Sequence, residues 1–213
     1  MNLPSPLYVI LDRGAVGHRE LEWVLEAVLA GGARLVQLRD KDTPLAVLYP
    51  RAKALCDRCH RAGALFIVND RADLALALGA GGLHVGQEDL PAPFARRILA
   101  HGMVLGVSTH DLEQARRAQA EGADYIAVGS IFPTGTKAGF QLVGPELIRR
   151  ARAEIAAPLV GIGGITADNA GEVIAAGADA VAVISAICGA ADPEAATRRL
   201  LDRAEAAVRS RAN

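Results

Sequence analysis

The stretch RAGALFIVND, residues 61–70, combines the two features that decide the fold. A helical segment ends at Gly63, and a short apolar run from Leu65 to Val68 follows almost at once. Glycine just past a helix end adopts the left-handed backbone conformation without a penalty from a Cβ atom, so this pattern predicts a turn from helix to strand. The run then stops on Asn69 and Asp70, which places a carboxamide and a carboxylate at the end of a buried strand.

The same pattern recurs along the chain. It is found in AGGARLVQLRD (30–40), LGAGGLHVGQED (78–89), EGADYIAVGS (121–130) and AGADAVAVIS (176–185). Three more apolar runs complete a set of eight strands: LYVILD (7–12), MVLGVS (103–108) and PLVGIGGI (158–165). Helical patterns alternate with these runs, so we predict an α/β protein, a (β/α)8 TIM barrel. A doubly wound open sheet is the alternative, because strand number alone does not establish closure.

Length and composition indicate one domain. The 213 residues are 51% hydrophobic, which is enough to bury a full core, and no linker or low-complexity tract interrupts the alternation. We therefore predict a single catalytic domain over residues 1–213. Pro50 should kink or restart the second helix, because it lacks the N–H that the helical ladder needs.

The charge balance argues against large anionic partners. With 23 basic and 24 acidic residues, the chain has no excess charge that would favour nucleic acid or a membrane surface. No apolar run approaches the length of a membrane-spanning helix, and the first residues do not resemble a signal peptide. Three cysteines are too few for a disulfide framework. We expect a soluble, cytoplasmic protein, and both a monomer and a homo-oligomer are compatible with the sequence.

CDRCH, residues 56–60, matches the attachment motif of c-type haem. Helical spacing of the apolar residues around it, however, places Cys56 and Cys59 on one apolar helix face. We therefore interpret both thiols as core residues.

Strand ends carry the candidate chemistry, because the active sites of such barrels lie where the strands end. Asp70 and Asp89 each follow an apolar strand, and neighbouring strands lie about 4.8 Å apart, so the two carboxylates could share one cation. Hard oxygen ligands of this kind suit Mg2+ bound to a substrate phosphate. The alternative is that each aspartate caps the helix that follows it.

Basic residues near two strand ends suggest an anion clamp. The chain has three lysines, and Lys41 and Lys137 follow predicted strands, with Arg39 beside the first. Arg39 can bind a diphosphate with its guanidinium fork, and each lysine adds a mobile charge.

Gly163 and Gly164 suggest a second anion site, because loops at this end of a barrel often bind phosphate through backbone N–H groups. Glycine there would allow a close approach that a side chain would block. Two anion sites and one Mg2+ imply two phosphorylated substrates or one long bisphosphate. His84 lies inside a strand, and we interpret it as a satisfied core residue rather than an acid or base.

Six motifs, in order along nearly the whole chain, resemble those of the thiamine-phosphate synthase family. They are QLRDK (37–41), NDRADLALALGAGGLHVGQED (69–89), GVSTH (106–110), ADYIAVGSIFPTGTK (123–137), GIGGIT (161–166) and VISAI (183–187). The resemblance implies transfer of a pyrimidinylmethyl group from 4-amino-5-hydroxymethyl-2-methylpyrimidine diphosphate to 4-methyl-5-(2-phosphoethyl)thiazole. The products would be thiamine phosphate and diphosphate.

The resemblance also implies roles for individual residues. Asp70 and Asp89 would bind Mg2+, and catalysis would depend on Arg39, Lys41, Ser108 and Lys137. The pyrimidine diphosphate would be held by Gln37, Leu38, Arg39, Asp40, Lys41, Asn69, Ser108 and Lys137. The thiazole phosphate would be held by Thr134, Gly135, Thr136, Gly164, Ile184 and Ser185.

The sequence departs from the family pattern in TKAGFQLVG, residues 136–144, where Ala138, Gly139 and Phe140 stand in place of an expected polar or acidic residue. A sister branch of the family, a thiazole tautomerase or a catalytically silent regulatory homologue, is the alternative. That branch carries a histidine near the position of Ser130, so the serine argues against it.

Overall fold

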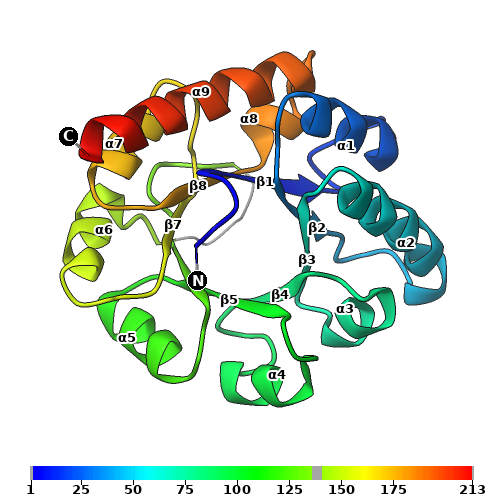
Figure 1. Ribbon diagram of the computed structural model, residues 1–213, viewed down its shortest axis with the longest axis horizontal. Coiled ribbons are helices and arrows are strands. Elements are labelled where there is room, and N and C mark those ends of the chain that lie inside the picture. The colour runs from blue at the N-terminus through cyan, green and yellow to red at the C-terminus, as the bar shows by residue number, and fades with distance from the viewer. Residues whose placement is uncertain (1, 136–140, 213) are drawn as a thin grey trace.

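Eight parallel strands close into a barrel in chain order, and β1 pairs with both β2 and β8 (Figure 1). The computed structural model describes residues 2–135 and 141–212. The strands are β1 (Leu7–Asp12), β2 (Leu35–Arg39), β3 (Leu65–Asn69), β4 (Gly82–Val85), β5 (Val104–Thr109), β6 (Tyr125–Val128), β7 (Leu159–Ile162) and β8 (Ala180–Val183). The predicted TIM barrel is confirmed, and the open sheet is wrong.

Helices surround the strands on the outside of the barrel (Figure 1). They are α1 (Leu21–Ala30), α2 (Leu45–Arg61), α3 (Ala72–Leu78), α4 (Ala92–Ile98), α5 (Leu112–Ala120), α6 (Gly144–Arg152), α7 (Ala170–Ala175), α8 (Ser185–Cys188) and α9 (Pro193–Ala212). The long α9 contacts both α1 and α7 and so covers the region where the chain closes on itself. Pro50 does not restart α2, which continues through it.

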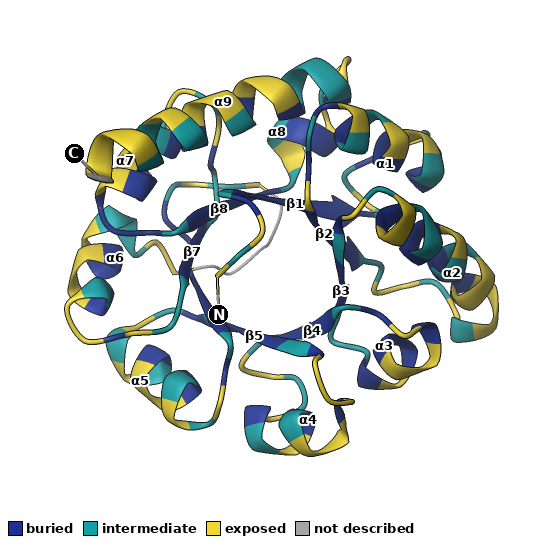
Figure 2. Cartoon of the chain, viewed as in Figure 1, coloured by how far each residue is buried: buried dark blue, intermediate teal, exposed yellow. Residues whose placement is uncertain are grey.

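Alternation along each strand divides the core in two. In β1, Leu7, Val9 and Leu11 belong to the large apolar cluster that includes the helices, whereas Tyr8 and Ile10 belong to a second cluster inside the barrel. This is the period of two expected of strands whose two faces are both buried. Figure 2 shows the result: the strands are almost entirely buried, and the exposed residues gather on the outer faces of the helices.

Glycine makes room for aromatic rings inside the barrel. Gly106 in β5 is paired with Tyr125 in β6, and a Cβ atom at Gly106 would lie 2.0 Å from the Cζ atom of Tyr125. Such a distance is far inside van der Waals contact. The missing side chain at Gly106 is therefore what allows the Tyr125 ring to fill the barrel interior.

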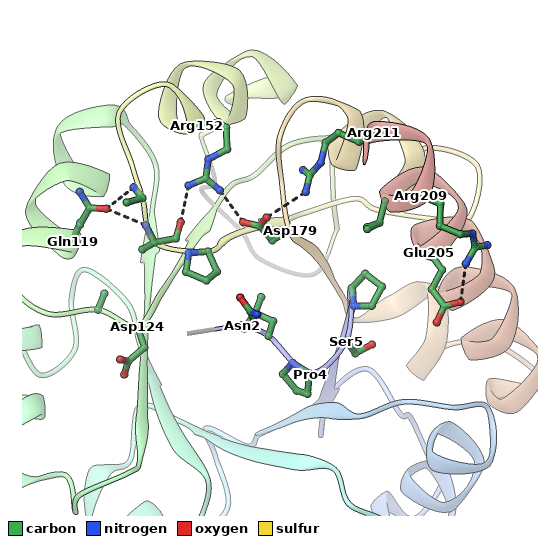
Figure 3. Close-up of a pocket in the computed structure, with 17 residues that line it drawn as sticks. Asn2, Pro4, Ser5, Gln119, Asp124, Arg152, Asp179, Glu205, Arg209 and Arg211 are labelled. Carbon is green, nitrogen blue, oxygen red and sulfur yellow. Dashed lines mark hydrogen bonds and ion pairs between the residues drawn. The ribbon is translucent and has the colours of Figure 1, made fainter. Parts of the chain in front are cut away.

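A hollow of about 890 Å3 lies at the amino ends of the strands, where residues 2–6 cross the mouth of the barrel (Figure 3). Its charges are paired with one another. Arg152 Nη1 lies 2.8 Å from Asp179 Oδ2, and Arg211 Nη2 lies 3.3 Å from Asp179 Oδ1. Asp124, near the same hollow, forms an ion pair with Arg96. These contacts join the strand starts to the helices, which is a structural role.

Cys56 and Cys59 are fully buried on the inner face of α2, which confirms their predicted place in the core. Burial raises the pKa of Cys56 to about 11 and that of Cys59 to about 12. Both thiols are therefore protonated and unreactive at neutral pH. Among the helices within residues 2–135 and 141–212, none is both long enough and apolar enough to cross a membrane.

Replacing Gly106 with alanine tests the packing inside the barrel. Because the new methyl group would overlap the Tyr125 ring, we expect Gly106→Ala to lower the free energy of unfolding by about 1–3 kcal/mol or more. Urea unfolding followed by circular dichroism measures the change. Gly171→Ala in α7 is the matched control, since its Cβ atom would lie an ordinary 4.0 Å from that of Ala207. Equal stability of the two variants would contradict the packing argument.

Candidate active site at the carboxyl ends of the strands

A cavity of about 500 Å3 opens at the carboxyl ends of the strands, and most of the predicted site residues line it. Alternation explains the convergence, because Gln37, Arg39, Asn69 and Ser108 all occupy inward-facing positions of their strands. The predicted residues that line the cavity are Gln37, Arg39, Lys41, Asn69, Asp70, Asp89, Ser108, Thr134, Gly164, Ile184 and Ser185.

Three predicted residues do not line this cavity. Leu38 is 2% exposed and belongs to the cluster between the strands and the helices, because it occupies an outward-facing position of β2. Asp40 turns its carboxylate to the loop before α2, where it accepts hydrogen bonds from the N–H and hydroxyl of Thr43 at 3.0 and 2.8 Å. Gly135 is exposed. Thr136 and Lys137, and the unusual residues 138–140, lie outside the described part of the chain.

Asp70 and Asp89 do not cap the helices that follow them. The cap position of α3 is Arg71 and that of α4 is Pro91. Asp70 has a left-handed backbone with φ of 60°, and its Oδ2 atom lies 2.9 Å from Lys41 Nζ. Asp89 Oδ2 accepts a hydrogen bond from the N–H of Gly86 at 2.7 Å, within its own loop. The alternative of simple helix capping is therefore wrong for both residues.

The two carboxylates are close enough to influence each other. Burial raises the pKa of Asp70, and a hydrogen bond and charge repulsion from Asp89 raise it further, while the ammonium group of Lys41 opposes both effects. A pair of crowded carboxylates gains from a shared cation. No group of three or more acidic, histidine or cysteine ligands gathers anywhere in residues 2–135 and 141–212. An ion held here would thus take its other ligands from water and substrate oxygens, which is how Mg2+ usually binds.

Arg39 is held by a partner that sequence reasoning missed. The guanidinium Nη1 forms an ion pair with the carboxylate of Asp12, the last residue of β1, which is 4% exposed. The other oxygen of Asp12 accepts a hydrogen bond from the N–H of Ala15 at 2.9 Å. Asp12 therefore fixes the side chain of Arg39 at the rim of the cavity. The available signal was that β1 ends in aspartate, directly beside the strand that ends in Arg39.

The glycine pair after β7 has a packing explanation. A Cβ atom at Gly163 would lie 1.9 Å from Ser130 Oγ, and one at Gly164 would lie 2.4 Å from the carbonyl oxygen of Pro133. Both residues also have positive φ angles, 102° and 63°. The requirement for glycine thus comes from the loop after β6, which packs directly against this turn. Space for a phosphate is not needed to explain it.

Ser108 and His84 are joined at the floor of the cavity. Ser108 Oγ lies 2.8 Å from His84 Nε2, and His84 Nδ1 lies 2.9 Å from the hydroxyl oxygen of Tyr125. Both ring nitrogens of His84 are therefore satisfied, as predicted. The residue nevertheless lines the cavity as well as the barrel core.

Cationic side chains beside a pair of carboxylates, at the carboxyl ends of a closed βα barrel, define a class of protein: a TIM-barrel enzyme whose active site lies in the loops that follow the strands. Comparison with known proteins narrows this class. Residues 7–187 match the family model for thiamine monophosphate synthase. The chain belongs to this family of transferases of thiamine biosynthesis.

Individual proteins of this family are similar to the chain over nearly its whole length. A thiamine-phosphate synthase of Moorella thermoacetica is 52% identical over 91% of this chain and 93% of its own length. One from Methanocella arvoryzae is 46% identical over 91% of this chain and 92% of its own. The solved thiamine phosphate pyrophosphorylase of Pyrococcus furiosus superposes with a TM-score of 0.88 at 40% identity, covering 95% of this chain and 96% of that one. The tautomerase or silent alternative finds no support in these relatives.

Asp12→Asn tests whether Asp12 positions Arg39. The amide keeps an oxygen for the Ala15 N–H but loses the charge that holds the guanidinium, so we expect kcat/KM to fall by about 10- to 100-fold. Steady-state kinetics with both substrates measure the effect. Asp111→Asn, a matched change at the cap of α5 where asparagine caps equally well, should leave kcat/KM unchanged. Similar kinetics for the two variants would rule out a positioning role for Asp12.

Proposed function

We propose that this protein joins 4-amino-5-hydroxymethyl-2-methylpyrimidine diphosphate to 4-methyl-5-(2-phosphoethyl)thiazole, with Mg2+ bound at Asp70 and Asp89. The observation that carries the proposal is the convergence of Asp70, Asp89, Lys41 and Arg39 in one cavity. Two carboxylates beside two cationic groups suit a magnesium diphosphate better than a bare phosphate or a neutral sugar. The proposed setting is the cytoplasm, in keeping with the three free thiols.

The bonds that change are few. The bond between the pyrimidine methylene carbon and the diphosphate oxygen breaks, and both of its electrons leave with diphosphate. The thiazole nitrogen then supplies its lone pair to the methylene carbon and becomes the positive nitrogen of the thiazolium ring. No proton needs to be removed, so the reaction requires no strong base. Its barrier lies in the charge that develops on the leaving group, and groups placed to receive that charge lower the barrier.

The side chains of the cavity suit this task. Arg39, held in place by Asp12, can form two parallel hydrogen bonds to the diphosphate, and Lys41 adds a charge that moves with its flexible stem. Ser108 adds a neutral donor from the end of β5. Lys137, which lies between β6 and α6 in the sequence, is proposed to act on the same group. These groups bind and orient the diphosphate and favour its departure.

Asp70 and Asp89 are proposed to hold Mg2+. When bound, the ion neutralises charge on the diphosphate as it leaves. Asp70 faces Lys41 and Asp89 at once, so its carboxylate is shared between the cationic side chain and the metal position. Asn69, next to Asp70 at the end of β3, is proposed to donate its amide hydrogens to the same diphosphate.

The thiazole phosphate is proposed to lie on the opposite side of the cavity. Thr134 and Gly164 come together there because the loop after β6 packs against the turn after β7. Ile184 and Ser185 follow β8 and line the same side. Gly135 and Thr136, which follow Thr134 in the sequence, are proposed to bind the same phosphate. This arrangement would bring the thiazole nitrogen toward the pyrimidine bound near Gln37.

The overall reaction is tested by mixing the two substrates with the protein and Mg2+. We expect thiamine phosphate and diphosphate in equal amounts, and only when both substrates and a divalent cation are present. Liquid chromatography of thiamine phosphate and an enzymatic assay of diphosphate measure both products. Turnover of the thiazole alone would identify a tautomerase instead, and absence of any reaction would contradict the proposal.

Asp89→Asn tests the metal position. A neutral amide is a weaker ligand for Mg2+ than a carboxylate, so we expect the Mg2+ concentration for half-maximal activity to rise by about tenfold or more. Titration of activity with Mg2+ measures this. Glu88→Gln is the matched control, because Glu88 is the adjacent acidic residue of the same loop and is exposed. An equal shift in both variants would mean that general charge, and not coordination, explains the effect.

A further inference from the structure

Five polar side chains form a continuous hydrogen-bonded chain across the barrel interior, which we call the barrel relay. Gln37 Nε2 donates to the hydroxyl of Tyr8 at 2.7 Å, and the hydroxyl oxygens of Tyr8 and Tyr125 lie 2.9 Å apart. Tyr125 Oη lies 2.9 Å from His84 Nδ1, and His84 Nε2 lies 2.8 Å from Ser108 Oγ. Both ends of the relay, Gln37 and Ser108, line the candidate active site.

The middle of the relay is sealed from water. Tyr8 is 1% exposed, Tyr125 is fully buried and His84 is 6% exposed. The rings also pack on one another: His84 stacks on Tyr125 with centroids 5.6 Å apart, and Tyr8 meets Tyr125 edge to face at 5.8 Å. In such a place an unsatisfied hydroxyl or ring nitrogen costs free energy, so every donor in the relay needs its acceptor.

The hydrogen atoms available in the barrel relay fix which group donates and which accepts at each hydrogen bond. Tyr8 accepts a hydrogen from Gln37, so its own hydroxyl hydrogen must go to Tyr125, its other partner among the described residues. Tyr125 therefore donates to His84 Nδ1, which must be bare. A neutral imidazole with a bare Nδ1 carries its hydrogen on Nε2 and donates it to Ser108 Oγ. The hydroxyl hydrogen of Ser108 is then left for the cavity.

The opposite direction fails at one atom. If Ser108 donated to His84, then His84 would donate to Tyr125 and Tyr125 to Tyr8. Tyr8 would then accept from both Tyr125 and the Nε2 atom of Gln37, and its own hydrogen would have no acceptor among the described residues.

Burial also keeps the imidazole of His84 and the hydroxyl groups of Tyr8 and Tyr125 uncharged. It lowers the pKa of His84 to about 4 and raises the pKa of Tyr8 and of Tyr125.

We propose that the barrel relay fixes Ser108 as a hydrogen-bond donor toward the departing diphosphate, with His84 and Tyr125 as positioning residues. A free serine hydroxyl can donate or accept, and one that accepts would repel the oxygens of a diphosphate. Because Ser108 already accepts from His84, its remaining hydrogen is directed at the substrate. This inference rests on the proposed function, and it gives the buried polar interior of the barrel a role in the reaction.

The direction of the relay can be read from the ring nitrogens of His84. Nitrogen-15 chemical shifts distinguish a bare from a protonated ring nitrogen, and with five histidines in the chain the His84 signals can be assigned by replacing His84. We expect a bare Nδ1 and a protonated Nε2 at neutral pH. In Tyr125→Phe, which keeps the ring but removes the donor, the two tautomers should mix. Tyr49→Phe, an exposed hydroxyl on α2, is the matched control and should change neither signal.

Single-turnover kinetics test the consequence. Ser108→Ala should lower the rate of diphosphate release by about 100-fold, and Tyr125→Phe, which only loosens the orientation of Ser108, by about tenfold. The KM for the thiazole phosphate should be unchanged in both. His84→Gln should retain more activity than His84→Asn, because the carboxamide nitrogen of glutamine reaches as far as Nε2 whereas that of asparagine reaches only as far as Nδ1.

The results of these experiments distinguish failure of the barrel relay from failure of the proposed function. A protonated Nδ1 in an active wild-type enzyme, or a Tyr125→Phe enzyme as fast as Tyr49→Phe, would overturn the relay while the proposed function stands. A wild type that forms no thiamine phosphate would overturn the proposed function, and with it the role of Ser108, whatever the tautomer of His84. The expected tautomer together with the graded loss of rate would establish the relay.

Discussion

Closure of the eight strands sends every second side chain toward the barrel axis, whose middle water does not reach, and the rest of the structure depends on this constraint. At the amino ends of β2 and β8 the inward positions are filled by the apolar residues Leu35 and Ala180. Toward the carboxyl ends the same positions carry Gln37, His84 and other polar groups. Since these groups cannot turn outward without breaking the alternation, they must satisfy one another. The polar groups at the base of the candidate active site are therefore held in place by hydrogen bonds to one another.

The fold could be predicted because its signals are local and repeated. Glycine at helix ends and apolar runs of strand length identify eight βα units, which predict a TIM barrel, whereas closure itself is established by the pairing of β1 with β8. Positions within a strand were harder to judge. The motif QLRDK predicts site roles for Leu38 and Asp40 as well as for their neighbours Gln37, Arg39 and Lys41. The strict period of two turns Leu38 outward, and a local hydrogen bond turns Asp40 into its loop.

What the sequence could not show are relations between distant segments. Asp12 and Arg39 end neighbouring strands, yet nothing within either stretch indicates that one carboxylate holds the other's guanidinium. The sequence suggests phosphate binding at Gly164, whereas in the structure a side chain at this position would collide with the carbonyl of Pro133 in another loop. Tyr125, which pairs with His84 Nδ1, comes from β6, and Tyr8, which pairs with Tyr125, comes from β1, so these rings meet only inside the folded barrel. Each of these three contacts depends on strand register and barrel closure, which are properties of the whole chain.

Burying polar side chains inside the barrel costs free energy that aliphatic side chains would not cost, unless every polar group is hydrogen-bonded. Each member of the barrel relay therefore depends on its neighbours. Removing a single hydroxyl from Tyr8 or Tyr125 leaves a neighbour unpaired in a dry environment, which is more costly than replacing the whole set with apolar residues of the same shape. The direction of the relay also depends on every member, because one reversed donor reverses all those after it. Gly106 is part of the same arrangement, since only a residue without a side chain lets the Tyr125 ring reach His84. Stability of the barrel and the hydrogen-bonding state of Ser108 are therefore set by the same few atoms.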